Sequence, residues 1–239
     1  MNLKFLLLSF VNRKMGGRTI VINLDNPWLR IKAEDYDLHM GHVNVAQLQM
    51  LNLIMKEQFN IIPEELRPMS EYAILGITNG NGLEHIDSMK IGKVIGIDIN
   101  KAFLDECLQR YGYLGKRLEL LQIDLIKEKK SVIMNLIRPQ LIISNLLIEH
   151  IHLDNFIDIL QKLPKQNRIV SCVIQYNQDG IIASTSGHEH VFNEILPMVE
   201  EVNENDIIQS MQILGYALEL RKEYILSNRK IFIRLDFSS

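Results

Sequence analysis

The stretch YAILGITNGNGLEHI, Tyr72 to Ile86, sets the interpretation of the whole chain. A short apolar run, typical of a buried strand, breaks into three glycines spaced over seven residues, and apolar and charged residues then resume. Glycine is favoured where the chain turns with a positive φ, or where another group comes close to the bare backbone. The stretch therefore predicts a strand followed by a tight turn, with either a bound ligand or nothing beside it.

Strand and helix patterns alternate between Glu71 and Gln178. The predicted strands are 72–77, 93–98, 117–124, 139–145 and 167–175, each short and rich in Ile, Val and Leu. The predicted helices between them are 82–90, 101–111, 131–137 and 153–163. Such alternation indicates an α/β fold with a parallel sheet, doubly wound by helices on both faces through right-handed connections.

The flanking segments add a helix on each side of this block. One helix is predicted from Val43 to Phe59, and Pro63 and Pro68 separate it from the sheet. Another is predicted over 203–216, with an acidic first turn and a glycine near its end. The last two apolar runs are joined at SNR, 227–229, and predict an antiparallel hairpin that finishes the sheet.

Composition limits the classes of partner. The 239 residues are 47% hydrophobic, which is enough for a sizeable core, and the net charge of -3 does not favour nucleic acid. Cys107 and Cys172 belong to no metal-binding pattern, which fits a reducing compartment and no structural zinc. His188 and His190 have no further ligand cluster, so a polar loop is favoured there over a metal site. Oligomeric state is left open.

The N-terminal sequence MNLKFLLLSFVNRK has an apolar run that faintly resembles a secretion signal. It lacks a small-residue cleavage site and returns to charge at Arg13 and Lys14. No stretch elsewhere reaches the roughly 18 apolar residues of a membrane span. We therefore expect a cytoplasmic protein without a membrane partner.

Polar residues and glycines follow the predicted strands at their carboxyl ends, where ligands bind in open α/β sheets. Gly76, Thr78 and Gly80 follow the first strand, and the next three end in Asp98, Asp124 and Asn145. Each residue alone also fits a plain turn or a helix cap, but together they favour a nucleoside-type ligand. Thr78 and Asn81 occupy positions where the dinucleotide fingerprint needs glycine, and the phosphate-loop pattern is absent.

At these residues the chain resembles the class I S-adenosylmethionine-dependent methyltransferases. The resemblance runs from about Tyr72 to Phe237 and rests on the glycine turn, VIGIDIN, LLQIDL, LIISNLLIEHI and the final hairpin. It implies a Rossmann-like, seven-stranded sheet whose last strand lies antiparallel beside the fifth. It also implies an N-terminal helical lid segment, residues 1–70, followed by a methyltransferase core, residues 71–239.

The resemblance assigns cofactor contacts to particular residues. It implies that Gly76, Thr78 and Gly80 face the methionyl part of S-adenosylmethionine, Asp98 the ribose, Asp124 the adenine and Asn145 the floor near the sulfonium. Ile99 and Leu125, which follow the two carboxylates, are expected beside the same cofactor.

Acceptor-side residues are expected after the fourth strand and in the N-terminal segment. His150 is the first candidate for a base that removes a proton from the acceptor, with Glu149 beside it. A helix terminus without chemistry is an equally weighted interpretation of His150. Tyr36, His39, Met40 and Trp28 are expected to cover the cofactor, and Tyr36 is a third catalytic candidate.

Three functional hypotheses follow. The first is methyl transfer to an unidentified small molecule. The second is a non-catalytic protein that binds S-adenosylmethionine or another nucleoside, suggested by Ile74 and Thr78, where relatives usually carry an acidic residue and a glycine. The third, a nicotinamide-dependent oxidoreductase, is disfavoured by Thr78 and Asn81.

Overall fold

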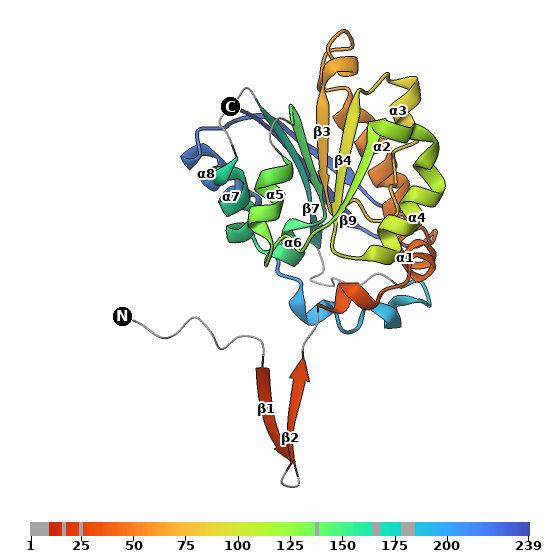
Figure 1. The fold of residues 1–239 in the computed structure, drawn as a ribbon, viewed down its shortest axis with the longest axis vertical. Coiled ribbons are helices and arrows are strands. Elements are labelled where there is room, and N and C mark those ends of the chain that lie inside the picture. The colour runs from red at the N-terminus through yellow and green to blue at the C-terminus, as the bar shows by residue number, and fades with distance from the viewer. Residues whose placement is uncertain (1–9, 16–17, 24–25, 137–138, 164–167, 178–184) are drawn as a thin grey trace.

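The computed structural model describes residues 10–15, 18–23, 26–136, 139–163, 168–177 and 185–239 (Figure 1). The signal-like N-terminal run therefore lies largely outside the described residues. Two strands that the sequence did not predict, β1 (Phe10–Met15) and β2 (Arg18–Asn23), pair antiparallel as a separate two-stranded sheet.

The main sheet has seven strands in the order β5-β4-β3-β6-β7-β9-β8. Their bounds are β3 (Glu71–Leu75), β4 (Lys93–Asp98), β5 (Leu118–Gln122), β6 (Leu141–Asn145), β7 (Ile169–Asn177), β8 (Ala217–Ile225) and β9 (Lys230–Ser238). Strands β3 to β7 pair in parallel, and β9 runs antiparallel between β7 and β8. The predicted fold class and the antiparallel hairpin joined at 227–229 are confirmed.

Helices cover both faces of this sheet because its strands alternate apolar side chains between the two faces. Ala73 and Leu75 of β3 lie in one buried cluster, and Tyr72 and Ile74 lie in another. In Figure 1 the first face carries α5, α7 and α8, and the second carries α2 and α4. Their bounds are α2 (Gln47–Phe59), α4 (Lys101–Tyr111), α5 (Lys129–Asn135), α7 (Leu153–Lys162) and α8 (Glu204–Ile213).

Helix α2 is part of this core. Met55 and Phe59 pack with residues of β3, and Leu51 and Ile54 pack with residues of β7 and β9. The N-terminal segment that covers the carboxyl ends of the strands is therefore shorter than residues 1–70. Within the described chain it consists of a short helical turn, η1 (Pro27–Arg30), and helix α1 (Ala33–Met40).

Several predicted bounds differ from the structure. Strand β3 ends at Leu75 because Gly76 has φ of 70°. The helix predicted over 82–90 shortens to α3 (His85–Ser88), since Gly82 (φ 92°) and Lys90 (φ 55°) leave the helical region. The helix predicted from Val43 begins at Gln47, after Ala46 in the left-handed region (φ 53°). Helix α1 was not predicted.

Strand order reverses at β3. Strands β4 and β5 lie on one side of it and β6 and β7 on the other, so the connections that follow β3 and β6 run in opposite directions and leave a crevice at the carboxyl ends of these two strands. The connection that contains η4 (Glu189–Phe192) and η5 (Leu196–Met198) lies next to α1 at this end of the sheet (Figure 1). The crevice is thereby roofed.

Candidate functional site

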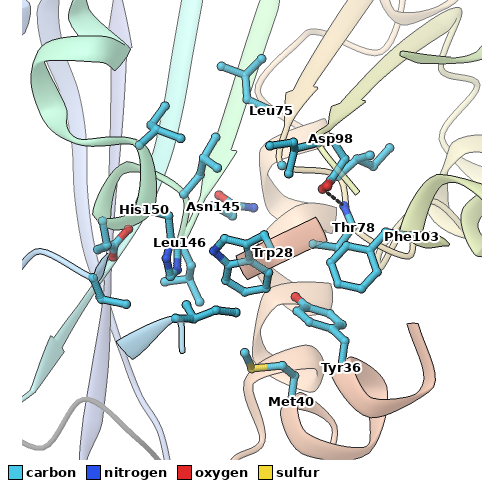
Figure 2. Close-up of a pocket in the computed structure, with 18 of the residues that line it drawn as sticks. Trp28, Tyr36, Met40, Leu75, Thr78, Asp98, Phe103, Asn145, Leu146 and His150 are labelled. Atoms are coloured by element: carbon cyan, nitrogen blue, oxygen red, sulfur yellow. Dashed lines mark hydrogen bonds between the residues drawn. The ribbon is translucent and has the colours of Figure 1, made fainter. Parts of the chain in front are cut away.

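A cavity of about 220 Å³ lies at the carboxyl ends of β3, β4, β5 and β6 (Figure 2). Seven of the eight predicted cofactor residues line it: Gly76, Thr78, Asp98, Ile99, Asp124, Leu125 and Asn145. The three catalytic candidates, Tyr36, Glu149 and His150, line it as well. Sheet topology brings together those that follow the strands, since the carboxyl ends of parallel strands meet at one edge of the sheet, whereas Tyr36 comes from α1.

The glycine turn divides between the cavity and the protein core. Gly76 (φ 70°) faces the cavity, where an added Cβ would lie 3.1 Å from a methyl carbon of Leu147. At Gly80 an added Cβ would lie 2.7 Å from the Cys107 sulfur of α4, and at Gly82 it would lie 2.6 Å from Met55 of α2. Gly80 is not among the residues that line the cavity, so its expected contact with the ligand stays a prediction. Gly80 and Gly82 are small because two helices pack against the turn.

Asp98 connects the end of β4 to this turn. Its carboxylate accepts the N–H of Thr78 at 3.0 Å through one oxygen and the N–H of Asn100 at 2.8 Å through the other. Burial raises the pKa of Asp98 to about 6, against the lowering effect of these backbone hydrogen bonds. Each carboxylate oxygen retains acceptor capacity on the cavity side, which suits the two hydroxyls of a ribose.

Asp124, after β5, mainly holds its own turn. One carboxylate oxygen accepts the N–H groups of Ile126 and Lys127, at 2.9 and 3.0 Å. Its other oxygen lies 3.8 Å from the Lys127 ammonium. Asp124 therefore offers a fixed, partly paired acceptor at the rim of the cavity.

Asn145 is held by a residue that sequence reasoning did not select. The amides of Asn145 and Gln58 exchange two hydrogen bonds of 2.9 Å each, and Gln58 also donates to Ser171 Oγ at 2.9 Å. The Ser171 hydroxyl in turn donates to Asp236 at 2.5 Å. Gln58 is fully buried, so this network fixes the orientation of Asn145 below the cavity.

Two asparagines attach the N-terminal cover, which consists of η1 and α1, to the turns after β3 and β4. The side-chain amide of Asn100 donates to the carbonyl oxygens of Trp28 and Ile31, both at 2.7 Å. The amide of Asn79 donates to the Ala33 carbonyl at 3.0 Å and to Asp37 at 2.9 Å. The cover is thus bonded directly to the turns after β3 and β4.

Aromatic side chains close the cavity from this cover. Figure 2 shows Trp28 between His150 and Asn145 on one side and Thr78 and Phe103 on the other. The ring centres of Trp28 and His150 lie 4.9 Å apart in an edge-to-face arrangement, and those of Tyr36 and Phe103 lie 5.1 Å apart. Burial raises the pKa of Tyr36 to about 12, so its hydroxyl stays protonated at neutral pH.

Glu149 and His150 lie in α6 (Ile148–Ile151), directly after β6. Glu149 is buried, and one of its carboxylate oxygens accepts the N–H of Gln175 at 2.8 Å. Burial raises the pKa of Glu149 to about 7, whereas burial lowers the pKa of His150 to about 4. Glu149 therefore has the proton affinity of a base that works near neutral pH, and His150 is an uncharged ring.

A second polar group lies where the sequence predicted only cover and loop. His39 Nδ1 lies 2.6 Å from the Ser186 hydroxyl, and the N–H of Ser186 donates to Glu189 at 3.0 Å. Both His39 and Glu189 line the cavity. Because 147 residues separate His39 from Ser186, no local pattern in the sequence could have paired them.

Two features are absent from the residues that the structure describes. No group of three or more His, Cys, Asp or Glu side chains within them could hold a metal ion. In the same part of the chain, no helix combines the length and apolar character needed to cross a membrane.

Comparison with solved structures identifies the fold. The magnesium protoporphyrin IX methyltransferase of Synechocystis PCC 6803, solved with S-adenosylmethionine, superposes with a TM-score of 0.55 at 10% identity, covering 81% of this chain and 80% of that one. A putative S-adenosylmethionine-dependent methyltransferase from Listeria monocytogenes gives 0.55 at 13% identity, covering 77% and 96%.

A phosphoethanolamine N-methyltransferase from Haemonchus contortus, in complex with phosphomonomethylethanolamine and S-adenosylhomocysteine, gives a TM-score of 0.59 at 13% identity, covering 86% of this chain and 56% of that one. Neither a protein-family model nor a curated protein sequence matches the chain. At these identities the likeness establishes the architecture, so the chain has the class I S-adenosylmethionine-dependent methyltransferase fold.

Proposed function

We propose that this protein binds S-adenosylmethionine in the cavity and transfers its methyl group to a small molecule. The observation that carries the proposal is the placement of Asp98 and Gly76 at the switch between β4, β3 and β6, where both line the cavity. Glycine backbone and a carboxylate at these two strand ends suit the methionyl and ribose parts of the cofactor. Relatives in fold are crystallised with this cofactor or its product.

The residues around Asp98 fit the rest of the ligand. Ile99, Ile123 and Leu125 provide apolar walls for an adenine ring next to Asp124, and Asn145 lies across β3 from them. When bound, S-adenosylmethionine supplies an electrophilic methyl group, whose bond to sulfur breaks as the acceptor bonds to it and leaves its electron pair on sulfur.

The chain's own contribution to transfer is positioning, exclusion of water and control of one proton. Trp28, Tyr36 and Phe192 roof the cavity and shield it from solvent. The Gln58 amide pair fixes Asn145, and fixed contacts hold two reactants in line at a low entropic cost. Glu149 is the base that removes the proton of the acceptor, and His150 is its uncharged neighbour.

A labelling experiment tests the proposal. Methyl-tritiated S-adenosylmethionine is incubated with the protein and a fractionated extract of small metabolites, and label is followed into products. We expect a labelled small molecule with wild-type protein and with the exposed control Glu65→Gln, and little label with Asp98→Asn. Binding of the cofactor without any labelled product would instead support a non-catalytic binding protein of this fold.

A further inference from the structure

The cavity has two chemically different ends. The end beneath β4 and β5, with Asp98 and Asp124, is the cofactor end in the function proposed above. The other end lies at β6 and β7 and includes Glu149, Gln175 and Asn177. What the second end accepts is inferred on the basis of that proposed function.

The charged side chains that line this cavity are acidic. Among the described residues that line it, none is Lys or Arg, and six are carboxylates: Asp98, Asp124, Glu149, Glu189, Glu200 and Glu201. Lys230, which pairs with Asn177 in the sheet, is buried and does not line the cavity, although its charge acts on His39. A carboxylate or phosphate on the acceptor would therefore meet only like charge among the charged side chains that line the cavity.

One of these carboxylates has an oxygen without a hydrogen-bond partner among the described residues. Glu149 is only 5% exposed and lines the cavity, and its Oε1 accepts the N–H of Gln175 at 2.8 Å. Its Oε2 is buried and has no hydrogen-bond partner among the described residues. A buried, unpaired carboxylate oxygen is costly, so a ligand N–H group that reaches it would gain a strong, charge-assisted hydrogen bond.

Aromatic rings surround the same end. Trp28 lies 6.1 Å from Phe192, centre to centre, and Phe192 lies 4.7 Å from the His39 ring. Burial lowers the pKa values of His39 and His150, which removes positive charge from this wall at neutral pH. Uncharged rings beside carboxylates form the kind of surface that binds organic ammonium groups.

We propose that the acceptor is a small amine that enters as an ammonium cation, and that Glu149 binds its N–H group and takes its proton. The N–H bond breaks as the proton moves to Glu149 Oε2, which frees the nitrogen lone pair. That lone pair would form the new bond to the methyl carbon as the carbon–sulfur bond breaks and leaves its electron pair on sulfur. Glu149 then releases the proton to solvent.

The test uses Trp28, the chain's single tryptophan, as the reporter. Protein saturated with S-adenosylhomocysteine is titrated at about pH 8 with phenethylamine, hydrocinnamate or phenethyl alcohol, and Trp28 emission is followed. The three probes share one skeleton and carry a positive, a negative or no charge. We expect phenethylamine to bind roughly tenfold or more tightly than hydrocinnamate, with phenethyl alcohol between them.

Two variants locate the effect. Glu149→Gln should weaken phenethylamine binding roughly tenfold and leave the affinities for phenethyl alcohol and S-adenosylhomocysteine unchanged. Glu65→Gln, at an exposed site before β3 that does not line the cavity, should change none of them.

Equal or tighter binding of hydrocinnamate, or no binding of phenethylamine to protein that holds S-adenosylhomocysteine, would overturn the inference and leave the proposed function intact. Failure to bind S-adenosylhomocysteine at all would overturn both. If Glu149→Gln does not fold, the wild-type comparison of the three probes still decides the outcome.

Discussion

The Asp98 carboxylate at the end of β4 accepts the backbone N–H of Thr78, in the turn after β3, at 3.0 Å. Thr78 has a positive φ of 50°, which is strained for a β-branched residue. The carboxylate that is proposed to bind the ribose therefore also stabilises the turn beside the methionyl group. Its protonation state affects both functions.

This relationship predicts a pH dependence of cofactor binding. Because burial raises the pKa of Asp98 to about 6, its carboxylate is charged above that pH and protonated below it. We expect the affinity for S-adenosylmethionine to be constant near pH 7 and to fall up to about tenfold per pH unit below about pH 6. Calorimetry across this range measures it. The same pH profile in Asp98→Asn would contradict the assignment to Asp98.

The glycines of the turn should separate stability from binding. Gly80→Ala places a methyl group 2.7 Å from the Cys107 sulfur, at a φ of 82°. We expect it to lower the free energy of unfolding by about 2–4 kcal/mol while the folded fraction still binds cofactor. Gly76→Ala, beside the cavity, should reduce the free energy of cofactor binding by more than it reduces the free energy of unfolding. Denaturant unfolding and calorimetry on both variants check this, and loss of binding by a stable Gly80→Ala protein would contradict it.

Glu149 should reduce stability at alkaline pH. Its folded pKa of about 7 exceeds its ordinary value of 4.5, so the stability contributed by its protonated form is full below pH 4.5 and lost as pH rises through 7. Glu149→Gln keeps an acceptor for the Gln175 N–H and removes the buried charge. We expect it to raise the free energy of unfolding by up to about 3 kcal/mol at about pH 8, with little change at about pH 4.5.

The matched control for this prediction is Glu65→Gln, because that side chain is exposed and does not line the cavity. It should alter stability by less than about 0.5 kcal/mol at either pH. Denaturant titrations at the two pH values measure all three proteins. A Glu149→Gln protein that is less stable than wild type at about pH 8 would show that the carboxylate is held by contacts beyond those described.

Asn100 is predicted to hold the cover in place. Its Oδ1 caps α4 by accepting the N–H of Ala102 at 2.8 Å, while its amide donates to Trp28 and Ile31. Serine is also a good cap but is too short to reach both carbonyls. Asn100→Ser should therefore speed hydrogen exchange in residues 26–40 at least tenfold and shift Trp28 emission to the red, with α4 still protected. Unchanged exchange in 26–40 would contradict this.

The sheet could be predicted because its local patterns agree with one another. The runs ending in Asp98 and Asn145 are apolar enough to be buried on both faces, and the segments between them have helical periodicity. Parallel strands then bring their carboxyl ends together without further information. That is why the residues after β3, β4, β5 and β6 could be placed at one site from sequence.

Other features depend on contacts that are distant in sequence. Gly76 and Gly80 look alike in the chain, yet one borders the cavity and the other packs on α4. Helix α1 shows little apolar periodicity and is held by burial of Tyr36 and His39. Asn145, which Gln58 holds, and the cover residues that Asn100 holds lie about 70 or more residues away from them, so neither of these roles has a local signal.

Isothermal titration of the purified protein with S-adenosylmethionine shows whether the cavity binds this cofactor. We expect one site per chain, a dissociation constant at or below the micromolar range, and an affinity at least about tenfold weaker in Asp98→Asn, with Glu65→Gln unchanged. No heat of binding at millimolar cofactor, or equal affinity in Asp98→Asn, would contradict it.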